Sequence, residues 1–341
     1  MYKITRKLFN AQLIYLLLIF TALLACGPIY QSVAMRYDLQ HISMSGKLID
    51  LGGYRLHLYC IGQRINSNPI VILEGGIGAP SLMWDLVQSS VAEEMRVCSY
   101  DRAGYGWSDP SPTSRTANQI ASELHNLLQQ AGEEPPYILI GHSFGGIVVR
   151  IYAAEYPTDV SGIILADARH EDFFERMPPE YLVLDKKNLQ HAKQLKLTTP
   201  LGITRFAGMT GSLDAFEAYL SPLQNDIERE AWSLMIYNPK HWSTAVAERE
   251  SIEESYRQVK LTSLPQDLPL VVLTAENGIE AWNSSESPIN DKAKATWMQM
   301  QRELSQLSSQ SQWIIIKNSG HYIYFDQPDA IINAALSLLE R

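Results

Sequence analysis

Short apolar and β-branched runs alternate with turn residues and longer amphipathic stretches from Gly46 to the C-terminus. This alternation is typical of a mostly parallel sheet whose faces are covered by helices. The Gly52-Gly53 pair between the first two runs favours a hairpin. The eight expected strands are Lys47 to Asp50, Tyr54 to Ile61, Ile70 to Glu74, Arg96 to Tyr100, Tyr137 to Ile140, Gly162 to Ala166, Leu268 to Thr274 and Trp313 to Lys317.

Apolar residues repeat at helical spacing between several of these strands, which predicts helices that turn one face to the core. The repeats are Ile120, Leu124, Leu127 and Leu128, then Trp297, Met300, Leu304 and Leu307, and in the tail Ile331, Ile332, Ala335, Leu336 and Leu339.

The alternation of strand and helix breaks once. Between Ala166 and Leu268 roughly 100 residues contain no strand pattern, which is far longer than an ordinary connection. We expect a helical cap over residues 170–264, inserted between strands six and seven above the carboxyl ends of the strands, where open α/β sheets place ligands. The core domain would then comprise residues 46–169 and 265–341.

The first segment, residues 1–35, predicts export. Lys3, Arg6 and Lys7 precede an apolar stretch from Leu13 to Ala25, as in a signal sequence. The run without charges from Leu8 to Met35 is long enough to cross a bilayer core of about 30 Å. We expect a membrane-anchored protein on the periplasmic or cell-surface side. A cleaved signal, an uncleaved anchor and a lipoprotein signal with lipidated Cys26 remain open.

Composition excludes several function classes. Hydrophobic residues make up 46% of the chain and charged residues 19%, so the chain can bury a large core. The net charge of −9 lacks the basic excess of a nucleic-acid-binding protein. The three cysteines are too few for a zinc cluster or a disulfide scaffold, and no metal or cofactor is expected.

One serine lies where a nucleophile is expected. Gly141-His142-Ser143-Phe144-Gly145 follows a strand and precedes an apolar helical stretch. A strand, a tight turn and a helix with small residues on both sides of the serine form a nucleophile elbow. A phosphate-binding loop is the alternative, but no lysine follows as a P-loop requires.

A serine nucleophile needs a base to accept its proton. Of the eight histidines, His321 comes directly after the last strand, where a loop would bring it above the carboxyl ends of the strands. The chain order serine, acid, histidine is then satisfied. His142 is interpreted as a packing or hydrogen-bonding neighbour of the nucleophile.

Taken together, these features resemble those of the α/β-hydrolase superfamily, from about Gly46 to the C-terminus. The similarity rests on the elbow, on the Asp101–Ser108 loop (DRAGYGWS) and on Gly320-His321. It implies an eight-stranded α/β-hydrolase fold with a helical cap. A serine in place of the aspartate of epoxide hydrolases and dehalogenases implies an acyl-enzyme. We therefore expect a serine hydrolase of the membrane-anchored or exported bacterial type that cleaves a carboxylic ester of a small molecule, with an amide as the open alternative.

The resemblance leaves the acid of the triad open. Gly278 occupies the place after strand seven where the family usually has an aspartate. Another branch, typified by some haloalkane dehalogenases, has its acid after strand six, where this chain has Asp167. Asp167 is our first candidate, Glu276 is the alternative, and Glu280 or another carboxylate is a further option.

The family also implies an oxyanion hole of two backbone N–H groups, here those of Gly76 and Phe144. Glu74 takes the place of a histidine in the family's loop, and either a structural salt bridge or an effect on the site is open. Asp101 and Arg102 are interpreted as structural.

Cys60 and Cys98 fall in strands that the family places side by side. A disulfide is conceivable, but we expect buried free thiols, because adjacent strands rarely offer disulfide geometry.

Two other functions remain open. The same triad would serve an acyltransferase or a carbon–carbon bond hydrolase, and a binding module could be built on a hydrolase scaffold that has lost its activity.

Overall fold

A single eight-stranded sheet organises the chain in the computed structural model, which describes residues 2–42, 44–211, 234–278 and 291–339. The strand order is β1-β2-β4-β3-β5-β6-β7-β8. Strand β2 is antiparallel to both of its neighbours, and the remaining pairs are parallel, which confirms the predicted fold class. The strands are β1 Lys47–Asp50, β2 Arg55–Ile61, β3 Ile70–Glu74, β4 Val97–Tyr100, β5 Tyr137–His142, β6 Val160–Ala166, β7 Leu270–Ala275 and β8 Ser311–Ile316.

The bounds of all eight strands lie within two residues of those expected from the sequence. The β1–β2 hairpin turns at Gly52 and Gly53, whose φ angles of 90° and 111° are accessible mainly to glycine. Side chains alternate between the two faces of β3: Ile70 and Ile72 join one buried cluster, and Val71 and Leu73 join the other. Both faces of the sheet are therefore covered.

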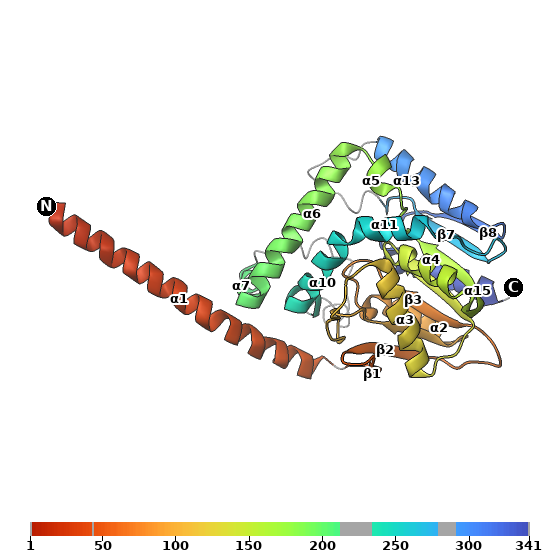
Figure 1. Cartoon of the computed structure of the whole chain (residues 1–341), viewed down its shortest axis with the longest axis horizontal. Coiled ribbons are helices and arrows are strands. Elements are labelled where there is room, and N and C mark those ends of the chain that lie inside the picture. Colours follow the sequence, from red (N-terminus) through yellow and green to blue (C-terminus); the bar gives the residue numbers. More distant parts are fainter. Residues whose placement is uncertain (1, 43, 212–233, 279–290, 340–341) are drawn as a thin grey trace.

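Helices cover the two faces, as Figure 1 shows. Apolar residues of α3, α4, α11 and α13 belong to the first cluster, and those of α2 and α15 belong to the second. The predicted apolar stripes lie on α3, α13 and α15. The helices of the core are η1 Ser81–Trp84, α2 Asp85–Val91, α3 Ala117–Ala131, α4 Gly145–Glu155, η2 Pro157–Asp159, α13 Asp291–Leu304, η4 Ser305–Leu307, α14 Ile323–Asp326 and α15 Pro328–Leu339.

In the described part of the long connection between β6 and β7, the regular secondary structure is helical. Its residues Ala192 and Leu195 on α6 pack against Trp242 and Val246 on α10, which gives this part a small apolar core of its own. The helices are α5 Phe173–Arg176, α6 Pro179–Thr198, η3 Thr199–Leu201, α7 Ile203–Met209, α10 Pro239–Glu250 and α11 Ile252–Lys260. The exact bounds predicted for the cap remain a prediction.

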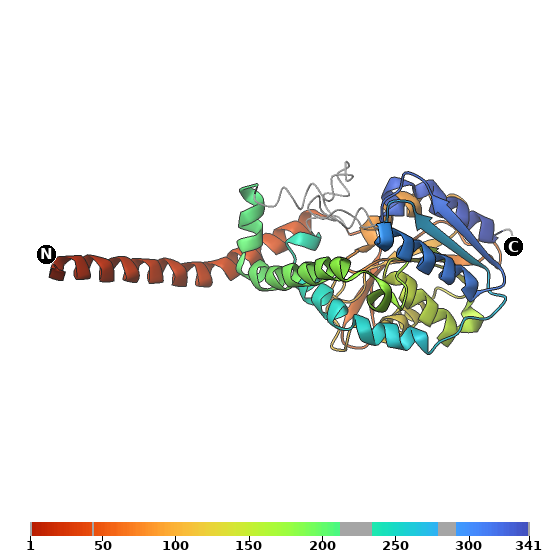
Figure 2. The same cartoon turned by 90° about the horizontal axis from the view of Figure 1, so that it is seen from above.

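The N-terminal segment forms one helix, α1 Tyr2–His41, which projects away from the sheet domain in Figures 1 and 2. Its C-terminal half is tied to the cap, because Asp38 pairs with Arg205 at 2.5 Å and Gln31 donates to the carbonyl oxygen of Tyr237. In the part of the chain that the structure describes, no helix has the length and apolar character of a membrane span. Export and membrane attachment stay predictions from the sequence.

One expectation is wrong: Cys60 and Cys98 form a disulfide rather than two free thiols. The two residues lie directly opposite each other in the antiparallel pairing of β2 with β4, so their side chains share one face. The carboxylate of Glu133 lies within 4.8 Å of both sulfur atoms. Because the disulfide leaves neither sulfur as a thiolate, these three residues cannot hold a metal ion in this state.

The disulfide predicts a specific alkylation pattern. Denatured protein treated with iodoacetamide should gain two more labels after reduction than without it, and peptide mass spectrometry should assign both to Cys60 and Cys98. Equal labelling of the two samples would contradict the disulfide. Reduction should also lower the free energy of unfolding by about 3 kcal/mol, because it frees the chain between the two cysteines.

Candidate active site

Ser143 stands at a sharp turn between β5 and α4. Its φ angle is 53°, in the left-handed region that residues other than glycine rarely adopt. The turn is held from both sides, because the Ser143 N–H donates to the carbonyl oxygen of Ala166 at 3.2 Å and its carbonyl oxygen accepts from the Arg169 N–H at 2.9 Å. The loop after β6 thus fixes the backbone of the candidate nucleophile.

The glycines on either side of Ser143 are required by close backbone contacts. A Cβ atom on Gly141 would lie 2.7 Å from the carbonyl oxygen of Gly145. A Cβ atom on Gly145 would lie 2.5 Å from the carbonyl oxygen of Glu74. Any larger residue would force the elbow away from the end of β3. The predicted strand, turn and helix are therefore all present.

His321 and Asp167 are joined by a hydrogen bond of 2.6 Å between Nδ1 and Oδ2. They come from loops after β8 and β6, and both are almost completely buried. His142 supports the histidine loop, because its Nε2–H donates to the carbonyl oxygen of His321 at 2.9 Å. The neighbouring role predicted for His142 fits this contact.

Burial shifts the proton affinities of both partners. Loss of solvent raises the pKa of the Asp167 carboxyl group to about 7, against the opposing effect of two N–H donors. Burial also lowers the pKa of His321 well below its usual value, and the positive charge of Arg169 acts in the same direction. His321 is therefore neutral at pH 7, the form that accepts a proton.

The two donors to Asp167 were not identified from the sequence. Trp297 Nε1–H and the Ala275 backbone N–H each donate to Asp167 Oδ1 at 3.1 Å. Trp297 belongs to the apolar stripe of α13 and was interpreted only as a core residue. Its indole is a typical buried group with one polar atom, but only the fold reveals the partner of that atom.

Gly278 lies directly against Asp167. A Cβ atom on Gly278 would be 2.4 Å from Asp167 Oδ2. The resembling family usually carries its acid after β7, whereas Asp167 follows β6. In this structure the two positions lie in direct contact. Glycine at 278 leaves their shared volume to the Asp167 carboxylate.

The alternative acid candidates are Glu276 and Glu280. Glu276 Oε2 accepts from the backbone N–H of Asn318 at 3.1 Å, so Glu276 contacts the loop that leads to His321. Of the two candidate acids that lie within the described residues, Asp167 is the one bonded to the His321 imidazole. Glu280 lies outside the described residues.

The two proposed oxyanion donors flank the candidate nucleophile. Phe144 precedes the first residue of α4, where backbone N–H groups have no partner within the helix. A Cβ atom on Gly76 would lie 3.1 Å from Ser143 Cβ, so the Gly76 backbone runs beside the serine. Both predicted residues are therefore adjacent to Ser143.

Arg102 fixes the loop that carries Gly76. Its guanidinium donates to the carbonyl oxygen of Gly75 at 2.9 Å and to that of Gly76, and it pairs with Glu74 at 2.8 Å. Arg102 also pairs with Glu248 of α10 at 3.1 Å. Glu74 is thus salt-bridged, one of its two expected roles, and the predicted structural role of Arg102 extends to the oxyanion loop.

This network lies in the core. Glu74, Arg102 and Glu248 are each at most 2% exposed. Burial raises the pKa of Glu74 to about 7, and the Arg102 charge opposes that rise. Tyr100 and Tyr105 donate their hydroxyl groups to Glu74 and Glu248, respectively, which satisfies further acceptor sites. Asp101 is separate, since it pairs with His57 at 2.9 Å.

Ser143 and His321 line one cavity with about 560 Å³ of empty space, counted together with the solvent at its mouth. The cavity is lined by Gly76, Ile77, Ala79, His142, Ser143, Phe144, Arg169, Asn188, Arg249, His321, Tyr322 and Tyr324.

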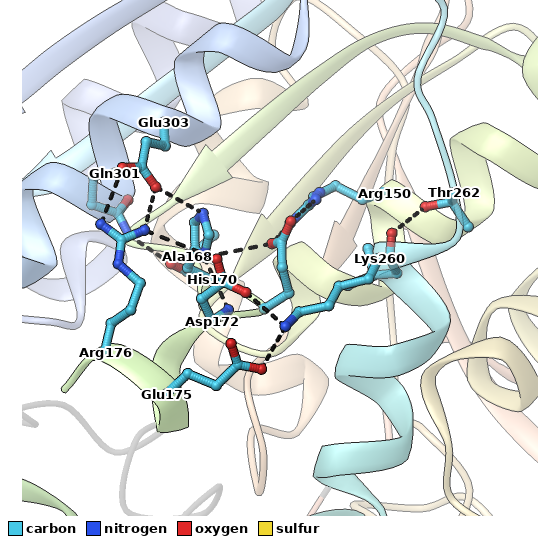
Figure 3. Close-up of polar contacts among 12 residues, drawn as sticks. Arg150, Ala168, His170, Asp172, Glu175, Arg176, Lys260, Thr262, Gln301 and Glu303 are labelled. Carbon is cyan, nitrogen blue, oxygen red and sulfur yellow. Dashed lines mark hydrogen bonds and ion pairs between the residues drawn. The ribbon is translucent and has the colours of Figure 1, made fainter. Parts of the chain in front are cut away.

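An ion-pair network near Ala168 ties the start of the cap to the core and the end of the cap to its start (Figure 3). At the start of the cap, Glu171 pairs with Arg150 of α4 at 2.6 Å. At its end, Lys260 pairs with Asp172 and Glu175, both at 2.7 Å. Other members connect to α13: Arg176 pairs with Glu303, His170 Nε2 lies 3.6 Å from Glu303, and Gln301 donates to the carbonyl oxygen of Ala168.

Known proteins resemble this chain in sequence and in fold. A family model described as the alpha/beta hydrolase fold matches residues 68–328. Among curated relatives, a probable transporter, efuK of Hormonema carpetanum, is 26% identical over 86% of this chain. That alignment covers 42% of the relative, which is therefore much longer than the matched region.

Solved structures share the fold at low identity. A thermophilic esterase from Thermogutta terrifontis, solved with malate bound, is 21% identical, with a TM-score of 0.59 over 86% of this chain and 97% of its own. The enol-lactonase of Burkholderia xenovorans LB400 is 16% identical, with a TM-score of 0.58 over 86% of this chain and 100% of its own. Identities this low establish the architecture alone.

The ion-pair network predicts acid-sensitive stability. Burial opposes ionisation of Glu171, but hydrogen bonds and the charge of Arg150 lower the pKa of Glu171 to about 2, from an ordinary 4.5. The stabilisation from this pair is complete above about pH 4.5 and is lost as the pH falls toward 2. Arg150→Met should cost about 3 kcal/mol at pH 7, and the difference from the wild type should shrink below pH 4.5.

Urea unfolding followed by circular dichroism between pH 7 and pH 3 measures this difference. Arg257→Met is the matched control, because Arg257 is 72% exposed and pairs with Glu254 on the protein surface. Its stability difference from the wild type should stay small throughout. A constant difference for Arg150→Met across the range would contradict the prediction.

Proposed function

The chain belongs to the α/β-hydrolase family, and from this premise we propose that it is a serine hydrolase that cleaves a carboxylic ester through an acyl-enzyme intermediate. One observation carries the proposal. His321, bonded to the buried Asp167 at 2.6 Å, lines the same cavity as Ser143, the serine at the strained elbow. These are the nucleophile, base and orienting acid that acyl transfer requires.

In the proposed reaction, Ser143 Oγ attacks the ester carbonyl carbon while neutral His321 accepts the serine proton at Nε2. The C–O bond to the alcohol then breaks, and His321 returns the proton to the leaving oxygen. Water attacks the acyl-enzyme by the same route and releases the acid and free Ser143. Asp167 is a positioning residue that holds Nδ1–H of His321 and stabilises the imidazolium.

The backbone N–H groups of Gly76 and Phe144 would stabilise the oxyanion that forms in both steps. Fixed donors need no rearrangement as charge develops, and losing one costs about 3 kcal/mol of transition-state stabilisation. The bonds from Arg102 to the carbonyl oxygens of Gly75 and Gly76 support this role, because they fix the peptide planes of the loop.

The structural neighbours support this reaction class. One is named an esterase and the other an enol-lactonase, and both names agree with a carboxylic ester as substrate.

We also propose that the enzyme works outside the reducing cytoplasm. The basic and apolar N-terminal segment supports export, and the Cys60–Cys98 disulfide supports an oxidising compartment, where such bonds persist.

Covalent labelling tests the nucleophile. A fluorophosphonate probe should label the wild type. It should also label the control variant Ser90→Ala, because the Ser90 hydroxyl is exposed on α2 and donates to the carbonyl oxygen of Leu86. Ser143→Ala should not be labelled, because no activated oxygen remains. The wild type should also cleave at least one member of a series of p-nitrophenyl esters from short to long acyl chain. Equal labelling of Ser143→Ala would contradict the proposal.

The shared volume of Asp167 and Gly278 predicts that the acid can be moved. Asp167→Gly should lower kcat on the best p-nitrophenyl ester on the order of 10³- to 10⁴-fold, because the imidazole loses its orienting acceptor. Adding Gly278→Asp should recover part of this loss. Glycine suits position 167, where φ is 43°, and the new carboxylate would occupy the vacated space.

Two controls accompany this swap. Gly278→Asp alone should lose activity, since its Cβ atom would stand 2.4 Å from Asp167 Oδ2. Glu276→Gln should retain most of kcat, because Glu276 bonds the Asn318 backbone. If Glu276→Gln abolished turnover while Asp167→Gly did not, the assignment of the acid would be wrong.

A further inference from the structure

We propose that the active-site cavity selects esters that carry a free carboxylate, bound by Arg249 at the cap side while the ester carbonyl meets Ser143. The inference rests on the proposed function and deepens it, because it names a substrate class. Charge is distributed unequally around the cavity, because cationic side chains line one part of its wall.

The described lining contains two guanidinium groups and no carboxylate. Arg169 and Arg249 line the cavity together with the amide of Asn188, and the other described lining residues are a glycine, an alanine, a serine, two histidines and apolar or aromatic residues. Low-dielectric walls of one charge sign concentrate a potential that attracts ligands of the opposite sign. A neutral ester would gain nothing from such a wall.

Arg249 is the group best suited to meet a ligand. It stands near the end of α10, and 26% of its side chain is exposed. Among the described residues, its ionic partner is Asp185 of α6, whose Oδ1 lies 3.9 Å from Nη1, beyond hydrogen-bond distance. A guanidinium held this loosely can turn its planar fork toward a carboxylate and form two parallel hydrogen bonds.

Arg169 adds a fixed positive charge beside the chemistry. It is 3% exposed, pairs with Asp185 at 3.3 Å and lies over the Phe173 ring at 3.8 Å. Its backbone N–H bonds the Ser143 carbonyl oxygen, so it is anchored next to the nucleophile. Arg169 and Arg249 both reach the same Oδ1 atom of Asp185, so one described carboxylate faces two cations.

The positions of the lining residues indicate how the two ends of a substrate would lie in the cavity. Ser143 and His321 lie at the carboxyl ends of the sheet strands, whereas Asn188 and Arg249 belong to the cap helices α6 and α10. A ligand that spans the cavity would therefore present its ester to the sheet and its carboxylate to the cap. The Asn188 amide offers an additional hydrogen-bond donor.

Binding tests the inference without turnover. The Ser143→Ala protein is titrated calorimetrically with the monoanion of monomethyl adipate and with its carboxamide analogue, in which CONH₂ replaces the carboxylate. The anion should bind about tenfold or more tightly, since hydrogen bonds to a charged group are roughly twice as strong as neutral ones. Arg249→Gln in the same background should bring the ratio close to one, and Arg249→Lys should keep part of it.

Lys193→Gln is the matched control. It removes one positive charge from the cap, but Lys193 pairs with Glu250 at 2.7 Å on the surface and is not among the cavity residues. The preference for the anion should survive in this variant. Loss of preference in Lys193→Gln as large as in Arg249→Gln would assign the effect to the general charge of the cap and overturn the proposal.

Turnover separates this inference from the proposed function. The otherwise wild-type enzyme is assayed on the p-nitrophenyl monoester of adipic acid and on the matching carboxamide ester, and kcat/KM should favour the anionic ester about tenfold or more. Ser143-dependent cleavage of both esters at equal rates, with equal binding, would overturn the inference alone. Selective binding of the anion without cleavage of any ester would overturn the proposed function and leave the binding site standing.

Discussion

The hydrogen bond between His321 and Asp167 is the contact on which the candidate site depends. It joins the loops after β8 and β6, and these loops reach each other because β7 alone separates their strands in the sheet. The same loop after β6 also binds the Ser143 backbone through Ala166 and Arg169. The buried turn that carries Asp167 therefore holds both the backbone of Ser143 and the imidazole of His321.

A second buried charge network connects the cap with this centre. Arg102 contacts the oxyanion loop on one side and Glu248 of α10 on the other. Arg249, the next residue on α10, lines the cavity. Helix α10 thus presents Glu248 to the arginine that holds the Gly75–Gly76 loop, and the adjacent Arg249 to the cavity. Away from α10, ion pairs tie the start of the cap to α4 and join its two ends (Figure 3).

The sequence predicted what local patterns encode. Short apolar and β-branched runs between turn residues predicted eight strands, and the glycine spacing around Ser143 predicted the elbow, because both arise from neighbours along the chain. It left the acid open, since the contact between Gly278 and Asp167 joins two distant loops. It missed the Trp297 donor and the grouping of Arg249 with Ser143 for the same reason. Cys60 and Cys98 were misjudged because their pairing depends on the register of β2 against β4.

Gly278 has a consequence for how such enzymes are recognised. A search that demands an acid after the seventh strand would classify this chain as a hydrolase that has lost its catalytic apparatus. Yet Gly278 borders Asp167, the carboxylate after the sixth strand that bonds His321, and an acid at this second place is what our proposed function requires. In related chains, a small residue at one of these two positions is best interpreted only after the other position has been inspected.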